Sequence, residues 1–401
     1  MSSLLKKIKS LRNHRIKWLT ISDFKDYCSG NKNTSYKILH SQKEVTVYPV
    51  PFIDMPYSEP KTCMAHEQYV VSLQNAKVIG SSNVVIAKRS LLYDLLKGGK
   101  YKITDIGLRW RFSKEGEWMS LSRFLGGCFA CYNNFGKRID SAVSLVGNYS
   151  WNFYHYIFEI AQKFYLIDAS GIPDDIPLLV DSVVKKVPQF LEILELLKGN
   201  RDVVYIEELE LCRVRTLFYP SFVHQIPPNL WDINKIVSED CYFDIEGLKY
   251  LRSKFLAYAK GAESTLPFKT GGKIFISRKV SNNRSYNEDE LMDIAIEQGY
   301  SVVYPEQMTI REQFAMYSQV DSIIAASGAA LSNILCCKPG CHILVLASSH
   351  WNLTVFSSIA GLMGLDMEYM CGKINDPNNV QSGFVIDKNV FKNYISKNGN
   401  R

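Results

Sequence analysis

Two arginines and a turn of small residues follow apolar runs in the second half of the chain, and their types suit phosphate binding. Arg278 follows the run "KIFIS", and Arg284 comes six residues later. Ser327, Gly328 and Ala329 follow the run "SIIAA". Guanidinium groups match phosphate oxygens bidentately, and a turn without bulky side chains lets backbone N–H groups at a helix start approach a phosphate closely. These residues predict a site for a phosphorylated ligand.

Two structural explanations compete with this interpretation. The small residues could serve only to pack the turn against a neighbouring helix, and either arginine could form a surface ion pair. The placement of the arginines and the turn on the same predicted sheet edge favours a ligand site. The sequence contains neither G-x-G-x-x-G nor G-x-x-x-x-G-K-[ST], so it lacks the usual signatures of dinucleotide binding and of a P-loop.

A second candidate centre lies in the segment "YSWNFYHYIFEIAQKF", which has helical periodicity. Trp151, His155 and Glu159 recur four residues apart and share one helix face. A glutamate one turn from a histidine can orient the imidazole for proton transfer. We expect His155 to be a base oriented by Glu159, or Glu159 to be the base itself. The alternative is a histidine packed in a core.

Strands alternate with helices in two series, a pattern typical of the parallel, doubly wound sheets of α/β proteins. The first series begins at residue 142 and includes a helix over residues 151–171. The second series begins at residue 273 and reads β-α-β-α-β-α-β-α. One of its helices is expected to open with a capping box formed by Thr309 and Glu312.

Ligands of open α/β sheets bind at the carboxyl ends of the strands, where helix N-termini point outward. In the second series this rule adds Asn283 and Asn287 from the first connection and Glu306 from the second. The helix from Asn287 is expected to open with a capping box in which Glu290 reaches back.

The two series are separated near residues 225–272, which predicts two α/β domains with a cleft between them. Residues 20–145 contain short strands such as "EVTVYPV" and "NVVIAK", with long helical periodicity only in "SLLYDLLKGG". They predict a strand-rich extension. We place the boundaries at residues 1–19, 20–240 and 241–401.

Residues 1–19 have the pattern of a basic amphipathic helix. Leu4, Ile8, Leu11 and Trp18 fall near one face, and lysines and arginines surround them. Such a helix can lie on an anionic membrane surface, or it can cap the protein body or fray. The stretch does not resemble a secretion signal, and no apolar run approaches the roughly 18 residues needed to span a bilayer.

Composition limits the classes of partner. A chain of 401 residues with 46% hydrophobic residues can build two cores. The net charge of +7 is spread along the chain, which argues against nucleic acid and suits anionic ligands. The ten cysteines have no regular spacing, which favours free thiols in a reducing compartment. Only Cys128 and Cys131 have metal-like or redox-like spacing, and without a second pair they indicate packed thiols.

Taken in order, these motifs resemble glycosyltransferase family 61. "NYSWNFYHYIFE" is similar to that family's Asn, Tyr/Phe, His, Glu helix. "FISRKVSNNRSYNEDEL" and "GYSVVYPEQMTIREQFAMYSQVDSIIAASGAALSN" are similar to its Ser-Arg, Arg, Asn-Glu, Pro-Glu, Glu-Gln and Gly-Ala-x-Leu-Ser/Thr-Asn series. The resemblance covers roughly residues 145 to 350.

The resemblance implies an α/β fold of GT-B type, with two Rossmann-like domains facing across a cleft. It also implies inverting transfer of a sugar from a nucleotide-sugar, with no metal or other cofactor. His155 and Glu159 would lie on the acceptor side. The donor-side residues carried over by position are Arg278, Arg284, Asn287, Glu306, Ser327, Gly328, Ala329 and Asn333, and Asn283 joins them from its loop. Many members have a histidine where this chain has Ser327, so we assign no acid catalysis there.

The absence of a convincing Asp-x-Asp motif agrees with a metal-free site, in which arginines and a helix N-terminus neutralise the leaving diphosphate. Bacterial members usually serve surface polysaccharide assembly, as in capsule, O-antigen or exopolysaccharide. We therefore expect a cytoplasmic enzyme, peripheral on the membrane, that takes a nucleotide-sugar donor and a saccharide or lipid-linked saccharide acceptor. The alternatives are a non-catalytic nucleotide-sugar or glycan-binding subunit of the same fold, suggested by Ser327, and a transferase such as a polysaccharide pyruvyltransferase.

Overall fold

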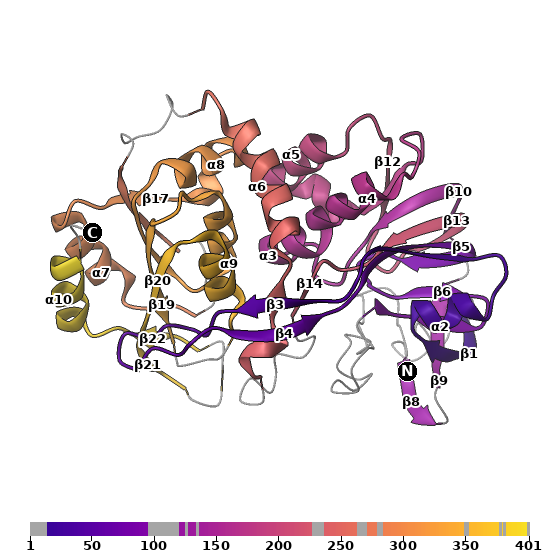
Figure 1. The fold of residues 1–401 in the computed structure, drawn as a ribbon, viewed down its shortest axis with the longest axis horizontal. Coiled ribbons are helices and arrows are strands. Elements are labelled where there is room, and N and C mark those ends of the chain that lie inside the picture. Colours follow the sequence, from indigo (N-terminus) through magenta and orange to yellow (C-terminus); the bar gives the residue numbers. More distant parts are fainter. Residues whose placement is uncertain are drawn as a thin grey trace, which may run out of the picture. The chain divides into compact units, whose positions relative to one another are not determined.

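The computed structural model describes residues 14–94, 120–124, 127–133, 136–226, 236–262, 271–278, 284–348, 353–376, 379 and 382–398. They form two compact units (Figure 1). The first unit holds the described residues up to Lys43 together with His66–Val223, and the second holds Glu44–Ala65, His224–Ile226 and the described residues after Asp232. Both units are mixed α/β structures, as the alternation of strands and helices predicts.

The first unit is built on one large sheet whose central part is parallel. Four neighbouring strands run in the order β12 (Val203–Ile206), β11 (Leu178–Asp181), β10 (Gly136–Leu145) and β13 (Leu211–Pro220). In chain order this is 3-2-1-4, an order found in doubly wound nucleotide-binding folds. The helical stretch between Phe153 and Ser170 connects β10 to β11, and α5 (Pro188–Leu197) precedes β12. This arrangement confirms the first predicted series.

Antiparallel strands extend this sheet beyond β13. The strand β5 (Gln68–Ile79) pairs with β13 and also with β2 (Ser35–His40). The path then continues through β6 (Val85–Ala87), β7 (Ser90–Leu92), β1 (His14–Ser22), β9 (Gly127–Asn133) and β8 (Ser120–Phe124). The short helix α2 (Phe24–Ser29) packs on the sheet, where the ring of Phe24 stacks on Tyr219 at 4.5 Å.

The structure corrects two helix predictions in this region. Residues 14–19, expected in the helix over 1–19, belong to β1, which pairs with β9 on one edge and β7 on the other. Residues 90–92, which begin the helical pattern of "SLLYDLLKGG", form β7. In both places pairing with distant strands satisfies the backbone and overrides local periodicity. Residues 1–13 and 95–99 lie outside the described residues.

The second unit contains a five-stranded parallel sheet. Its order is β17 (Ser301–Val303), β16 (Lys273–Ile276), β18 (Ser322–Ala326), β19 (His342–Ala347) and β20 (Asp366–Cys371). In chain order this is 2-1-3-4-5, a doubly wound topology whose direction of winding changes between β16 and β18. Ligands of such sheets bind at the carboxyl ends next to that change.

Helices cover both faces of this sheet (Figure 1). On one face α7 (Glu288–Glu297) and α10 (Lys388–Asn398) pack together, and Leu291 and Phe391 join the core residues Phe275, Ile324 and Leu344 of the strands. Figure 1 shows α8 (Ile310–Gln319) and α9 (Val355–Met363) on the other side, where α6 (Ile245–Ala259) and the 3₁₀ helix η10 (Ala329–Cys336) also pack. The predicted capping box of Thr309 and Glu312 at the start of α8 is confirmed.

A hairpin from early in the chain belongs to the second unit. The strands β3 (Lys43–Val47) and β4 (Lys61–Ala65) pair with each other, and Phe52 between them bridges to Tyr369 in β20. Residues 44–65, which we expected in the first domain, therefore belong to the second unit. The unit also contains two short antiparallel strand pairs, β14 (His224–Gln225) with β15 (Tyr242–Phe243) and β21 (Lys373–Ile374) with β22 (Phe384–Val385). The one-turn helix η7 (Ser238–Asp240) precedes β15.

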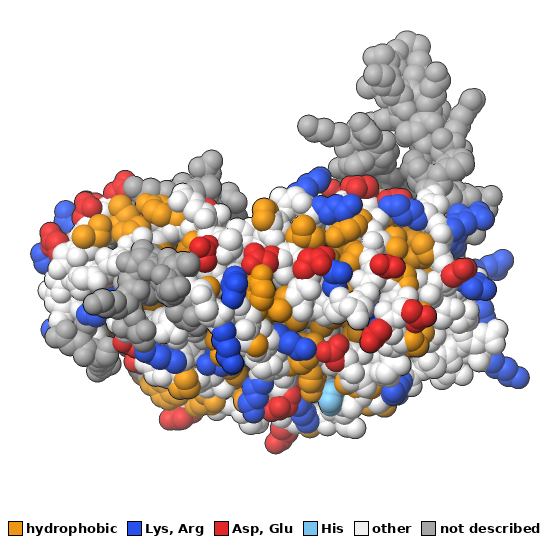
Figure 2. Space-filling view, turned by 90° about the horizontal axis from the view of Figure 1, so that it is seen from above, with side chains coloured by type: hydrophobic (Ala, Val, Ile, Leu, Met, Phe, Trp, Pro, Cys, Tyr) orange, Lys and Arg blue, Asp and Glu red, His pale blue; other side chains and the backbone are white. Residues whose placement is uncertain are grey.

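Charged side chains of both signs are interspersed on the face shown in Figure 2, in agreement with a diffuse net charge. In the part of the chain that the structure describes, no helix is both long enough and apolar enough to cross a membrane.

Candidate active site

The change in winding direction of the second sheet brings Arg278 next to the small turn after β18. The Nη1 of Arg278 donates a hydrogen bond to the carbonyl oxygen of Ser327 at 3.1 Å. A Cβ on Gly328 would lie 3.7 Å from the same Nη1. Gly328 has φ 177°, which is extended backbone that any residue adopts. The glycine is therefore valuable for the open space that it leaves beside the guanidinium.

Arg284 adds a second positive charge to this place. Burial lowers the pKa of Arg284 to about 10, and the nearby charge of Arg278 acts in the same direction. Burial also lowers the pKa of Arg278, although Tyr286 and Glu288 oppose this effect. Both guanidinium groups stay charged at neutral pH. The buried Nε of Arg284 has no hydrogen-bond partner among the described residues. Two half-buried, mutually repelling cations are a site that an anion would stabilise.

The backbone at Arg284 is also strained. Its φ is +54°, in the left-handed region that side chains other than glycine rarely adopt. Such strain is often stored at ligand sites, where the surrounding structure imposes it. The observation supports a binding role for this loop.

Glu288 organises the start of the site and was not singled out by the sequence. Its Oε1 accepts hydrogen bonds from Ser277 Oγ at 2.5 Å and from the Arg278 backbone N–H at 2.8 Å. As the first residue of α7, it also suits the positive end of the helix dipole. The acidic "NEDE" start of this helix is the signal that the sequence offers, and by itself it predicts only a helix cap.

The expected capping box at Asn287 is wrong. The Oδ1 of Asn287 accepts from the Ile386 N–H at 2.9 Å, and its Nδ2 donates to the Ile386 carbonyl and to Glu290, each at 3.0 Å. Glu290 therefore contacts the side chain of Asn287 and does not close a box with its backbone. Asn287 ties the segment after β22 to the start of α7, and any donor contact by this residue remains a prediction.

Asn333 is buried away from solvent, with 2% of its surface exposed. Its Nδ2 donates to Gln313 at 2.8 Å, and Gln313 in turn donates to the carbonyl of Pro305 at 2.8 Å. Pro305 opens the one-turn helix η9 (Pro305–Gln307) that carries the exposed Glu306. Asn333 thus holds the loop of Glu306. Ser327 and Ala329 are half-buried beside Gly328, and Asn283 lies outside the described residues.

In the first unit, the predicted helix over 151–171 forms with an irregular centre. It runs through α3 (Phe153–His155), one turn of π-helix (η3, Tyr156–Ile160), one turn of 3₁₀-helix (η4, Ala161–Lys163) and α4 (Phe164–Ser170). Gly171 ends it with φ 75°. Turns of π-helix inside helices are frequent at functional sites.

His155 and Glu159 contact each other as predicted. The Nδ1 of His155 lies 2.8 Å from Glu159 Oε1. The side chains are 18% and 10% exposed, respectively. A carboxylate on Nδ1 selects the tautomer whose Nε2 accepts a proton. The pair therefore has the geometry of a general base.

Lys163 lies one turn further along and is fully buried. Its Nζ lies 4.6 Å from the ring centroid of Tyr219 and 4.8 Å from that of Phe222, and it has no hydrogen-bond partner among the described residues. Burial lowers the pKa of Lys163 to about 8, against the opposing charges of Asp94, Glu159 and Asp181. The sequence offered only one signal, the four-residue spacing from Glu159.

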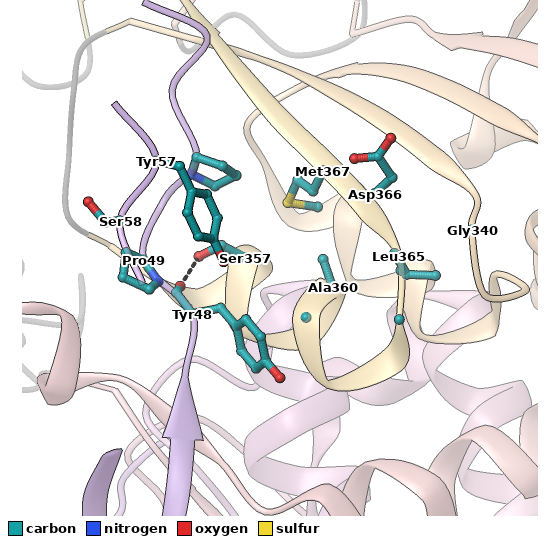
Figure 3. A pocket seen from close by; sticks show the side chains of 13 residues that line it. Tyr48, Pro49, Tyr57, Ser58, Gly340, Ser357, Ala360, Leu365, Asp366 and Met367 are labelled. Atoms are coloured by element: carbon teal, nitrogen blue, oxygen red, sulfur yellow. Dashed lines mark hydrogen bonds between the residues drawn. The ribbon is translucent and has the colours of Figure 1, made fainter. Parts of the chain in front are cut away.

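A separate hollow of about 450 Å³ in the second unit does not belong to this site (Figure 3). It lies between the hairpin and the starts of β19 and β20, and its lining includes Tyr48, Tyr57 and Asp366. The hydroxyl of Ser357 donates to the Tyr48 carbonyl at 2.7 Å there. This is the amino-terminal edge of the sheet, opposite to the edge of Arg278. Among the described residues, no cluster of three or more His, Cys, Asp or Glu could hold a metal ion.

An enzyme that transfers groups from phosphorylated donors is expected to combine an anion site with a general base. The two arginines provide the first, and the histidine–glutamate pair has the geometry of the second. The comparison with protein families identifies which kind of group-transfer enzyme this is. The family model described as glycosyltransferase 61 matches residues 153–344, from the start of α3 into β19. These residues belong to glycosyltransferase family 61, and the chain is a glycosyltransferase. No curated protein matches its sequence.

Proposed function

We propose that this glycosyltransferase is inverting and metal-independent, and that it transfers a sugar from a nucleotide-sugar to a saccharide acceptor in surface polysaccharide biosynthesis. The observation that carries the proposal is the arginine pair. Burial disfavours the charges of both Arg278 and Arg284, and the charge of Arg278 adds to this effect at Arg284. The diphosphate of a nucleotide-sugar would offset both effects, because it brings negative charge and oxygens that match two guanidinium groups.

In this proposal the arginines supply the positive charge that a divalent cation supplies in other glycosyltransferases. The first backbone N–H groups of η10 have no acceptor within the helix, and they are available to the same diphosphate beside Gly328. Glu288 fixes the backbone of Arg278. Ser327 is half-buried beside Arg278, and its hydroxyl can donate to a phosphate oxygen.

His155 is the proposed base. Its Nε2 takes the proton of the acceptor hydroxyl while the acceptor oxygen forms a bond to the anomeric carbon. The bond from that carbon to the diphosphate breaks on the opposite face, so the configuration inverts and the diphosphate leaves with the bonding electrons. Glu159 on Nδ1 stabilises the imidazolium that forms. The two units would form the domains of a GT-B enzyme, with the acceptor bound by the first and the donor by the second.

The setting we propose is the bacterial cytoplasm, at the inner face of the membrane, with a lipid-linked saccharide as one acceptor class. The family match favours an enzyme over the non-catalytic binding subunit considered above. A polysaccharide pyruvyltransferase would need no nucleotide-sugar, and the nucleotide-binding test below separates it from the proposal.

The test combines thermal shift and calorimetry with UDP, GDP and CMP. Binding at a hundredfold excess over Kd stabilises the folded state by about 2.7 kcal/mol, so the nucleotide that raises Tm identifies the donor class. Arg278→Ala should abolish this shift, and Arg278→Lys should restore it only in part, because an ammonium cannot grip two oxygens. Nucleotide affinity that is unchanged in Arg278→Ala would refute the assignment.

The chemistry has its own test. His155→Ala should lower turnover about 10²-fold to 10⁴-fold, as expected for loss of a general base, while nucleotide affinity stays unchanged. Glu159→Gln should cost less if Glu159 only orients the ring. A larger loss in Glu159→Gln than in His155→Ala would exchange the two roles. Activity that is insensitive to a chelator would support metal independence, and activity lost on chelation would contradict it.

A further inference from the structure

An exposed tryptophan lies at the start of the helix that carries His155. Trp151 has 54% of its surface exposed. The ring of Tyr149 lies 6.4 Å from Trp151 at an interplanar angle of 72°, and 4.8 Å from His155 at 38°. The three rings therefore form a continuous row, with the exposed indole at one end and the imidazole of the proposed base at the other.

The turn that presents these rings is held rigidly. The side chain of Asn83 accepts from the Asn148 N–H at 3.1 Å, and the side chain of Asn148 accepts from the Asn83 N–H at 3.0 Å. The Asn152 N–H donates to the Tyr149 carbonyl at 2.8 Å, and the Asn152 side chain caps the helix by accepting from Tyr154 N–H at 3.0 Å. Trp151 is thus exposed on a turn fixed from both sides, and a preorganised aromatic side chain binds without a large ordering penalty.

The aromatic rings of this row suit a pyranose sugar as their ligand. A pyranose ring has C–H groups on its faces and hydroxyl groups around its rim. Its faces pack on aromatic rings, and its hydroxyls need polar groups at the edge of the contact. Tyrosine and tryptophan offer both an apolar face and a polar edge, and the His155–Glu159 pair at the end of the row can receive a hydroxyl.

We propose that the exposed indole of Trp151, with Tyr149 beside it in an edge-to-face arrangement, is a platform on which a pyranose ring of the acceptor saccharide stacks, with its reacting hydroxyl directed toward His155. This inference rests on the proposed function and names residues that bind the acceptor. A nucleobase is the other common ligand that stacks on an indole, and the test distinguishes it from a sugar.

The test uses the full-length protein on an array of pyranose oligosaccharides, and calorimetry with UDP, GDP and CMP. The variants are Trp151→Ala and the conservative Trp151→Phe. Tyr57→Ala is the control, because Tyr57 is an aromatic residue of the second unit with 68% of its surface exposed. We expect Trp151→Ala to weaken glycan binding about tenfold, the scale of a lost stacking contact. Trp151→Phe and Tyr57→Ala should retain the wild-type glycan affinities, and nucleotide affinity should not change in any variant.

The platform is refuted if Trp151→Ala binds the same glycans as the wild type with equal affinity, or if the wild type binds none. A loss of nucleotide affinity in Trp151→Ala would instead assign the indole to the donor base. Because the array requires neither nucleotide nor turnover, its result is independent of the Arg278 variants. Failure of the proposed donor site and failure of the platform are therefore distinguishable.

Discussion

Arg284 offers a test in which stability and binding should change in opposite directions. Burial and the charge of Arg278 lower the pKa of Arg284 from the ordinary value of an arginine to about 10. One pKa unit corresponds to about 1.4 kcal/mol, so holding this charge in the folded protein costs about 3 kcal/mol. The group is charged in both the folded and the unfolded state at every pH below 10, and the full cost is therefore present at pH 7. A recovery of stability would begin only above pH 10.

Arg284→Asn removes the charge and keeps a residue that tolerates a positive φ. We expect the free energy of unfolding without ligand to rise by about 1 to 3 kcal/mol, with the lower value allowing for lost packing of the arginine stem. The stabilisation by nucleotide, about 2.7 kcal/mol at a hundredfold excess over Kd, should largely disappear. Urea denaturation with and without UDP, GDP or CMP measures both quantities.

Arg252→Ala is the matched control. The Nη1 of Arg252 donates to the carbonyls of Leu335 and Cys337 at 2.5 and 2.6 Å, at the end of η10 away from Gly328. Its loss should destabilise the protein by about 1 to 3 kcal/mol because buried acceptors lose their donor, and nucleotide affinity should not change. If Arg284→Asn is destabilised like this control, or keeps the nucleotide effect, the anion-site argument fails.

The remaining predictions concern other parts of both units. Gly328→Val should fold with a normal Tm, because the backbone at this position is extended and a Cβ there has only ordinary contacts. Calorimetry should show nucleotide affinity at least about tenfold lower, because the valine side chain fills the space beside Arg278. In the wild type, the free energy of unfolding should rise by about 3 kcal/mol between pH 8 and 10.5 because of Lys163. The pKa of this lysine is lowered to about 8 in the folded protein, so in this pH range the unfolded chain binds a proton at Lys163 more tightly than the folded protein does. Lys163→Met should lack this rise in urea titrations, and an identical pH profile would contradict the burial of a charged amine. Thr309→Ala should lower the free energy of unfolding by about 1 kcal/mol through loss of the capping box, without changing nucleotide affinity.

Four of the five strands of the second sheet could be predicted from the sequence, because each is a short apolar run that ends in polar residues. The fifth strand, β20, has the sequence DMEYMC, which is not an apolar run, and it was not predicted. The pattern of apolar runs also placed Arg278, Ser327 and Gly328 at one edge. The pattern could not predict the hydrogen-bond partners of the side-chain amides of Asn287 and Asn333. Both residues bond to protein groups, at Ile386 and Gln313, that lie far away in sequence. An asparagine in a motif does not indicate whether its partner is a ligand or a distant backbone.

In the N-terminal region, the sequence pattern predicted the wrong type of secondary structure. Residues 14–19 carry part of a helical pattern, yet they form β1 because two strands from elsewhere in the sheet pair with its edges. Periodicity reports only what a segment can bury locally. The backbone hydrogen-bond partners of β1 are supplied by β7 and β9, which lie far away in the sequence. No pattern within residues 1–19 can therefore predict that these residues form a strand.

Arg284, which is half-buried, and Lys163, which is fully buried, differ in the charges that surround them, and this difference distinguishes a ligand site from an internal ion cluster. The charges near Lys163 come from Asp94, Glu159 and Asp181, and all three oppose the effect of burial on its pKa. The charge near Arg284 comes from Arg278, and it adds to the effect of burial. Protein carboxylates therefore oppose the effect of burial on Lys163. At Arg284 the charge that the described residues supply adds to the effect of burial, and a bound anion would offset both. Such a pair lowers stability when no ligand is bound, as binding and catalytic sites often do. The diphosphate that leaves in the proposed reaction is an anion that would make the pair favourable.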